Sequence, residues 1–208
     1  MEEKLKKEQE KLSKKLVLRN DFKEPRLIAG SDAVYTGNKV IYVMIVFDFD
    51  SLEKKEVKYT VMEAKMPHLK EFAGFRQAPA AVETYHKLET DPDIIMVGGA
   101  GIMHPRRLGE ASQLGLLLDK PTIGVAKEQL FGNLEEDTVY DKEQQIAKML
   151  ITKEHAKPIY ISPGHRINLQ RATEIASRML GEKKLPIPVH EAHKYGNKIK
   201  KRIKEKGD

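Results

Sequence analysis

The chain has 208 residues, of which 33% are charged, and it contains no cysteine and no tryptophan. The lack of thiols excludes disulfides and zinc–thiolate sites, and no apolar run reaches the ~18 residues that a membrane span needs. The charged N-terminal run does not have the pattern of a signal peptide, so we expect one folded domain in a cytoplasmic protein.

The positive charge gathers at one end of the chain. The formal net charge is +6, and residues 194–206 alone, with six lysines, Arg202 and Glu205, account for +6. Such a segment suits a phosphate backbone or an acidic partner, and it equally suits a solvated helix that aids solubility. We therefore expect a domain at 1–188, followed by a basic C-terminal tail at 189–208.

The first half of the chain predicts a surface helix and an antiparallel meander. Residues 2–16 place leucines along one helical face. Tight turns separate three strands, expected at 26–35, 40–49 and 57–62. A loop and then a helix over about residues 79–88 complete this half.

The second half alternates short buried strands with helices. Strands are expected at 93–97, 121–127, 146–152 and 158–162, the third of which is ambiguous with a helix. Helices are expected at 109–118 and at 168–180, and an acidic loop is expected at 128–142. This order predicts an α/β fold, with a β-meander followed by parallel strands in one mixed sheet flanked by helices. It matches a ribonuclease H-like sheet.

Polar candidates lie at the ends of three predicted strands. Asp32 lies in an apolar strand, where a carboxylate is costly unless it is paired or binds a metal, so it is either a site residue or a satisfied core carboxylate. Residues 98–101 form a glycine loop that either holds a ligand or only makes a turn. Lys127 either orients a phosphate or a water or is a surface lysine. His104 and His165 lie in loops, where a histidine is more often structural than a ligand.

Five segments together resemble the Endonuclease V family, metal-dependent nucleases that recognise deaminated adenine (inosine) in nucleic acid. The segments are 29–35 (AGSDAVY), 75–79 (FRQAP), 99–107 (GAGIMHPRR), 121–127 (PTIGVAK) and 162–166 (SPGHR). The resemblance implies a ribonuclease H-like fold and cleavage, with Mg²⁺ or Mn²⁺, of the second phosphodiester 3′ to inosine. It also implies DNA or RNA as the partner, and we expect a monomer.

The resemblance further assigns roles to single residues. Asp32 matches the first of three metal carboxylates, whereas Gln77 and Gly98 stand at the positions of the other two. His104 and Lys127 match further catalytic positions of the family. The expected substrate-binding residues are Tyr35, His68 (in place of a wedge tyrosine), Gly99, Gly101, Arg106, Gly109 and His165.

The two replaced carboxylates lower the formal charge of this cluster from −3 to −1. Mg²⁺ is usually held by one or two carboxylates together with substrate phosphates, so we expect weak or no metal binding. The sequence thus predicts a nucleic-acid-binding protein with lost or severely reduced nuclease activity. One alternative is an active enzyme in which Glu110 or Asp119 supplies a replacement carboxylate. Another is a protein-interaction module that does not bind nucleic acid.

Overall fold

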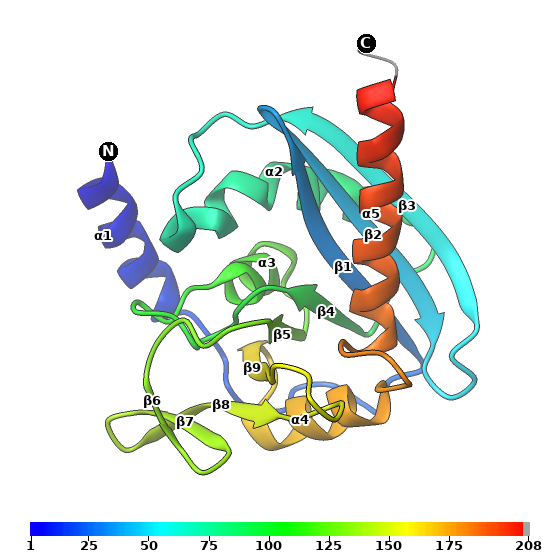
Figure 1. Ribbon diagram of the computed structural model, residues 1–208. Coiled ribbons are helices and arrows are strands. Elements are labelled where there is room, and N and C mark those ends of the chain that lie inside the picture. Colours follow the sequence, from blue (N-terminus) through cyan, green and yellow to red (C-terminus); the bar gives the residue numbers. More distant parts are fainter. Residues whose placement is uncertain (206–208) are drawn as a thin grey trace.

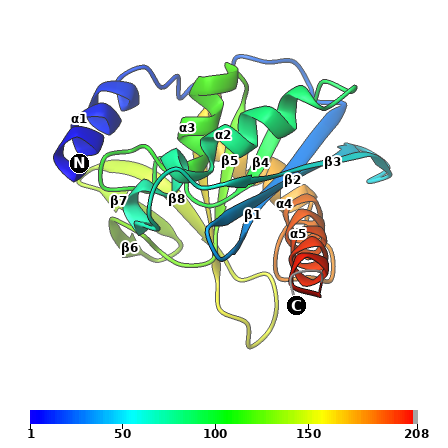
Figure 2. The ribbon, with the colours of Figure 1, turned by 90° about the horizontal axis from the view of Figure 1, so that it is seen from above.

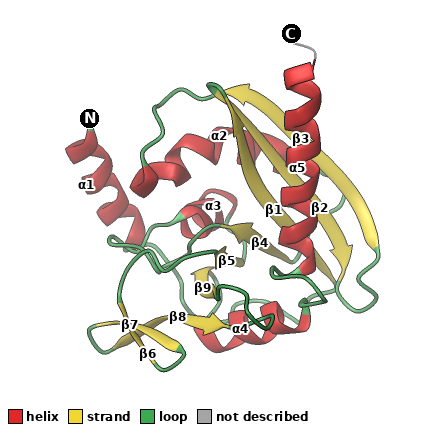
Figure 3. Cartoon of the chain, viewed as in Figure 1, coloured by secondary structure: helices red, strands yellow, loops and turns green. Residues whose placement is uncertain are grey.

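The structure is a computed structural model that describes residues 1–205, and its helices and strands are distinguished by colour in Figure 3. The helices are α1 (Glu2–Ser13), α2 (Ala73–His86), α3 (Glu110–Leu118), α4 (Leu169–Arg178) and α5 (Ile187–Glu205), and a 3-10 turn, η1, covers Lys70–Phe72. The strands are β1 (Leu27–Thr36), β2 (Lys39–Asp48), β3 (Lys54–Glu63), β4 (Ile94–Gly98), β5 (Thr122–Ala126), β6 (Asn133–Glu135), β7 (Thr138–Asp141), β8 (Gln144–Leu150) and β9 (Ile159–His165).

One mixed sheet runs through the molecule, in the order β3-β2-β1-β4-β5-β9-β8-β7-β6 (Figure 1). Figure 2 shows α2 and α3 on one face of this sheet and α4 and α5 on the other. The meander β1-β2-β3 is antiparallel, as predicted. Only β1, β4 and β5 are mutually parallel, because β9 returns antiparallel to β5. The parallel part is therefore shorter than the sequence led us to expect.

Strand β2 is the most completely buried element of the meander. Its residues from Val40 to Phe47 are all buried, because helices cover both faces of the sheet at this point. Apolar and β-branched side chains suit a strand covered on both sides, and each such side chain contributes roughly 1.5–3 kcal/mol by burial. This buried strand pairs with β1, in which Asp32 lies opposite Val43 in the register.

Helix α5 corrects the prediction of a separate C-terminal tail. It packs on the β1–β2 face and buries Val189, Ala192, Gly196 and Ile199. Gly196 lies against the Val34 side chain so closely that an added Cβ would overlap it. The division expected at residue 188 therefore falls inside a helix of the domain, and residues 206–208 lie outside the described part of the chain.

Three local predictions also need correction. Ser162–His165, read as a loop, is the buried second half of β9. The acidic loop expected at 128–142 contains the hairpin β6–β7. Helix α2 begins at Ala73, before the predicted start at residue 79. The ambiguous segment is strand β8, and Asn168 caps α4 as predicted by accepting from the Arg171 amide at 2.8 Å.

Membrane insertion finds no support in the helices. Within residues 1–205, none is both long and apolar enough to cross a bilayer.

Candidate active site

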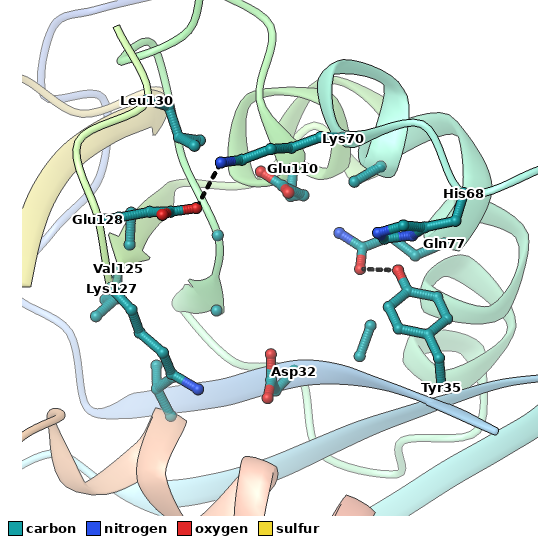
Figure 4. A pocket seen from close by; sticks show the side chains of 16 residues that line it. Asp32, Tyr35, His68, Lys70, Gln77, Glu110, Val125, Lys127, Glu128 and Leu130 are labelled. Carbon is teal, nitrogen blue, oxygen red and sulfur yellow. Dashed lines mark hydrogen bonds and ion pairs between the residues drawn. The ribbon is translucent and has the colours of Figure 1, made fainter.

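A pocket of about 520 Å³ lies at the C-terminal end of β4, beside β1 (Figure 4). Strand β1 pairs with β4 only as far as the register pair Ser31–Val97, so the β4-facing edge of β1 is free beyond that point. Asp32 and Tyr35 leave opposite faces of β1, and both reach the pocket across this free edge. The predicted site residues that line it are Asp32, Tyr35, His68, Gln77, Gly98, Gly99 and Lys127.

Asp32 makes its principal contact with a residue that the sequence did not single out. The His193 Nδ1 atom lies 2.5 Å from Asp32 Oδ2, and the two side chains are 39% and 12% exposed. His193 reaches Asp32 because alternate residues of β1 face α5. Gly30 lies against Pro188 in the same way that Val34 lies against Gly196. The carboxylate that resembles a metal ligand is thus held by an imidazole.

Gly98 and Gln77 stand where the family resemblance predicts further carboxylates; Gly98 adjoins Asp32, and Gln77 contacts Tyr35. A Cβ added to Gly98 would overlap Asp32 Oδ1, so the Asp32 side chain occupies the space beside this glycine. Gln77 is 5% exposed, and its Oε1 atom accepts a long hydrogen bond of 3.5 Å from the Tyr35 hydroxyl. Burial raises the pKa of Tyr35 to about 12, so its hydroxyl stays protonated and able to donate.

The donor set does not fit a resident Mg²⁺ ion. Within residues 1–205, no three side chains of His, Asp or Glu gather closely enough to hold a metal. Mg²⁺ needs several hard oxygen ligands in near-octahedral geometry. Here Asp32 is paired with His193, Gln77 offers a neutral amide oxygen, and Gly98 offers no side chain at all.

Glu110 is the second carboxyl group on the inner wall. It begins α3, and its Oε2 atom accepts from the Ala100 amide at 2.9 Å. The carboxyl group packs against Gly99, where an added Cβ would overlap it, and Gly99 has a φ of 150° that disfavours a side chain. Burial raises the pKa of Glu110, and the nearby charge of Asp32 raises it further, although the Ala100 and Glu110 amides oppose the shift.

Aromatic rings form another wall, and an ion pair crosses the mouth. The rings of Tyr35 and His68 meet edge to face, with centroids 5.7 Å apart. The Lys70 amine and Glu128 Oε1 lie 2.6 Å apart and join η1 to the loop after β5 across the opening (Figure 4). Lys127, next to Glu128, extends along the Asp32 side of the pocket in the same view.

His104 and Arg106, by contrast, do not reach the pocket. His104 is 4% exposed, its Nε2 atom lies 3.0 Å from the Glu71 carbonyl oxygen, and its Nδ1 atom accepts from the Arg106 amide at 3.2 Å. The Arg106 guanidinium binds Glu71 and the Gln9 side-chain oxygen, each at 2.6 Å. These contacts tie α1 to the loop before α3, so the two residues sit in a structural network.

Three more predicted residues also lie outside the pocket lining. Gly101 and Gly109 pack against backbone carbonyls, Gly101 against Pro163 and Gly109 against Ala100, and neither position has room for a Cβ. His165 is buried, and its Nδ1 atom accepts from the Val17 amide at 3.3 Å. Asp119, weighed as a replacement carboxylate, ends α3 opposite Glu110 and pairs with Arg166 at 2.8 Å.

Because His104 is buried, we expect the folded protein to lose stability in acid. Burial lowers the pKa of His104 from its ordinary 6.5 to about 4. Between these values the unfolded chain binds a proton that the folded chain does not, so stability falls as the pH falls from 6.5 to 4, by up to about 3 kcal/mol from this group. Urea unfolding of His104→Asn should show a flatter pH profile than the parent. His155→Asn, at an exposed position, is the matched control and should leave the profile unchanged.

His193, the partner of Asp32, is the candidate site residue that the sequence reasoning missed. A usable signal was present, since Val189, Ala192, Gly196, Ile199 and Ile203 repeat every three or four residues and predict a packed helix. The strong basic charge of the segment drew the interpretation toward a free tail instead. Once α5 is docked, His193, which lies between the buried residues Ala192 and Gly196, must face β1.

Known proteins are similar to this chain both in sequence and in overall structure. The sequence matches the family described as Endonuclease V over residues 10–194. It is 35% identical over 199 residues to the Endonuclease V of Dictyoglomus turgidum, and the aligned region covers 92% of this chain and 87% of the relative. The structure matches the Endonuclease V of Bacillus subtilis with a TM-score of 0.91 at 25% identity, covering 99% and 94% of the two chains. A Ciona intestinalis Endonuclease V solved with inosine-containing DNA matches with a TM-score of 0.85 at 24% identity, covering 96% and 98%. The chain belongs to the Endonuclease V family.

Proposed function

We propose that this protein binds nucleic acid in the manner of its family, inosine-containing DNA or RNA included, and that its phosphodiester hydrolysis is lost or severely reduced. The observation that carries the proposal is the state of Asp32. This residue is the one family-type metal carboxylate left, and it is hydrogen-bonded to His193 while leaning over Gly98.

The chemistry of hydrolysis explains why this change matters. Metal-assisted cleavage needs an ion that neutralises the charge of the transferring phosphate and lowers the pKa of a bound water. The inner wall of the pocket has Asp32, already paired, and Glu110, already bonded to the Ala100 amide. Each of these contacts engages one oxygen of its carboxylate, Oδ2 of Asp32 and Oε2 of Glu110, so a metal that takes these oxygens would compete with His193 and with the Ala100 amide.

Nucleic-acid binding rests on a different part of the molecule. The exposed residues Lys194, Lys198, Lys201 and Arg202 are here called the α5 basic row. The three lysines follow one another at four- and three-residue spacing along α5, and Arg202 comes directly after the last. At a rise of 1.5 Å per residue, cations four apart lie about 6 Å apart along one helical face, a spacing that suits successive phosphates. The same helix brings Val189 to the pocket wall and His193 to Asp32, so the row starts at the pocket.

A nicking assay tests the hydrolytic half of this proposal. The purified protein is incubated with a single strand that contains one inosine, with Mg²⁺ and Mn²⁺ in separate reactions. We expect no nicking above the background of the Asp32→Ala variant. Robust nicking that Asp32→Ala abolishes would overturn the proposal of an impaired enzyme.

A salt titration tests the binding half. Replacing Lys194, Lys198 and Lys201 by glutamine should weaken binding to the same strand and lower the slope of log K against log salt by about 2–3, because each phosphate contact contributes ~0.7–0.9. The matched control replaces the exposed Lys4, Lys7 and Lys11 of α1, which lies on the opposite side of the molecule from α5 (Figure 1). Equal slopes for both triple variants would count against the α5 basic row.

One observation supports an active enzyme with a rearranged site as the second candidate. Glu110 and Asp32 line the same pocket, so a cation could recruit both, whereas Asp119 is too far along α3 to join them. In that case both Asp32→Asn and Glu110→Gln would abolish nicking. If no nucleic acid binds at any salt concentration, a protein-interaction module is the remaining candidate.

A further inference from the structure

Strand β3 forms one edge of the sheet, and its outer side is unpaired. It comes first in the strand order, so within residues 1–205 it is hydrogen-bonded to β2 alone (Figure 1). Proteins usually protect such edges with short strands, prolines, charges or bulges. The strand at the opposite end, β6, has three residues, whereas β3 has ten, without proline and with a bulge only near its start, at Lys55.

The backbone groups along the β3 edge belong to alternate residues. The Ala64 amide donates to the Asn38 carbonyl oxygen at 2.7 Å, and this pair continues the register of β2 and β3. Hydrogen-bonded pairs alternate with other pairs along an antiparallel ladder. Even-numbered residues therefore bond to β2, whereas the odd-numbered residues from Val57 to Glu63 direct their N–H and C=O groups away from it.

The side chains of these odd-numbered residues form an apolar centre on one face of the edge. The ring of Tyr59 lies against that of Tyr195, with centroids 6.1 Å apart, so this is the face that carries α5. Tyr59 and Val61 are nevertheless 45% and 37% exposed, and Val57 beside them is only partly buried. The edge thus joins unpaired backbone groups to exposed apolar side chains.

The order of residues along β3 is complementary to itself. A second copy that runs antiparallel about Tyr59 places Tyr59 opposite Tyr59, Val57 opposite Val61, and Lys55 opposite Glu63. All these partners are odd-numbered, so the outward N–H and C=O groups of the two copies meet as hydrogen-bonded pairs. Apolar pairs and opposite charges are favourable across strands. A shift of two residues in either direction would instead place Lys55 or Glu63 opposite a valine.

The lysines of β3 do not oppose this pairing, because each has a carboxylate of its own chain nearby. Lys54 lies 3.3 Å from Glu191, and Lys58 lies 2.8 Å from Glu89. Lys55 lies 2.6 Å from Glu53. Both side chains of this last pair are exposed, and such pairs contribute little, so Lys55 can exchange Glu53 for a carboxylate of a second copy.

We propose that β3 is a self-association edge, at which two copies of this chain pair antiparallel about Tyr59 and form a dimer. The partner is a second copy because the charges and apolar residues of the strand match their own reverse order. The pairing uses the free β3 edge of both copies, so association ends at the dimer. The dimer replaces the monomer that we expected from the sequence, and it does not depend on the proposed nucleic-acid binding.

Sedimentation equilibrium of the full-length protein tests the association. One strand from each copy makes an interface at the small end of the usual range, so we expect a dissociation constant on the order of 10–100 µM. The average mass should rise with concentration from 23.7 kDa toward twice that value. Tyr59→Lys places like charges opposite each other and should weaken association by about 10-fold or more. Leu134→Lys, at a 39% exposed position of β6, is the matched control and should associate like the parent.

Single cysteines test the register, because the chain has none of its own. Cα atoms of a hydrogen-bonded antiparallel pair lie about 5.5 Å apart, within the range of a disulfide, so Tyr59→Cys should cross-link to its own copy under mild oxidation. Val57→Cys and Val61→Cys should each cross-link poorly alone, because the two copies of either position are offset by about 13 Å along the strands. A mixture of these two variants should cross-link efficiently.

Three results would count against this dimer. A mass that stays at 23.7 kDa up to about 500 µM, well above the expected dissociation constant, rules out the association. Equal weakening by Leu134→Lys and Tyr59→Lys shows that β3 is not the specific edge. Cross-linking of Tyr59→Cys that is no faster than that of Val57→Cys alone overturns the pairing about Tyr59, and this result stands even if Tyr59→Lys fails to fold.

Discussion

Restoring both missing carboxylates, with Gln77→Glu and Gly98→Asp together, is expected to give the protein a metal site and a measurable nicking activity. Two unit charges 4 Å apart interact by about 4 kcal/mol at an effective dielectric constant of 20, before desolvation is subtracted, so two added carboxylates should tighten Mn²⁺ binding by on the order of 100-fold or more. The three atoms nearest to a Cβ at position 98 all belong to the Asp32 side chain, Oδ1 and Cγ at less than 3.0 Å, and this side chain can rotate away. Rotation would separate Asp32 from His193 and free its oxygens for the ion.

Calorimetry with Mn²⁺ and nicking of an inosine-containing strand both report on this variant. Gly98→Asn in the parent background is the matched control, because it gives the two positions amide side chains of the same shape without charge. The control should bind Mn²⁺ no better than the parent. If the double variant folds and still does not bind Mn²⁺, the two missing charges do not account for the state of this site.

The sequence predicted the parts of the fold that depend on local pattern. Strand β2 was evident because buried, β-branched residues follow one another without interruption, and α4 was evident because Asn168 can cap the helix that follows it. We predicted a loop for Ser162–His165, because proline and glycine normally indicate a turn. In the structure these residues are a buried part of β9 that pairs with β5, and a Cβ on Gly164 would overlap the Thr122 side chain.

The site was harder to predict, because its contacts join distant parts of the chain. Asp32 and His193 are separated by 161 positions, and only the docking of α5 on β1 brings them together. Arg106 resembled a phosphate ligand in sequence, but it contacts Gln9, 97 positions away, on a helix whose position no local pattern could fix. Family resemblance singled out Asp32, Gln77 and Gly98, and these three residues line one pocket. It did not reveal what the remaining side chains do instead.

Helix α5 is therefore the element on which the site most depends, and Gly30→Ala tests how it is held. The backbone and ring of Pro188 lie directly against Gly30, so an added Cβ has no room unless the start of α5 moves away from β1. Overpacking of this kind costs about 1–3 kcal/mol, or more where backbone must shift. We expect a lower urea midpoint and faster proteolysis within residues 187–205.

The same substitution at Gly37 separates packing from backbone strain. Gly37 has a φ of 53° and no atom within 4 Å of an added Cβ, so Gly37→Ala should cost about 1 kcal/mol through its backbone alone and leave α5 docked. If α5 is displaced in Gly30→Ala, His193 and the α5 basic row move together. Binding of the inosine-containing nucleic-acid strand should therefore weaken in Gly30→Ala and not in Gly37→Ala. If Gly30→Ala binds and unfolds like the parent, the contact with Pro188 does not hold the helix. The docking of α5 would then rest on its other contacts with β1, which include Gly196 against Val34 and the Asp32–His193 contact.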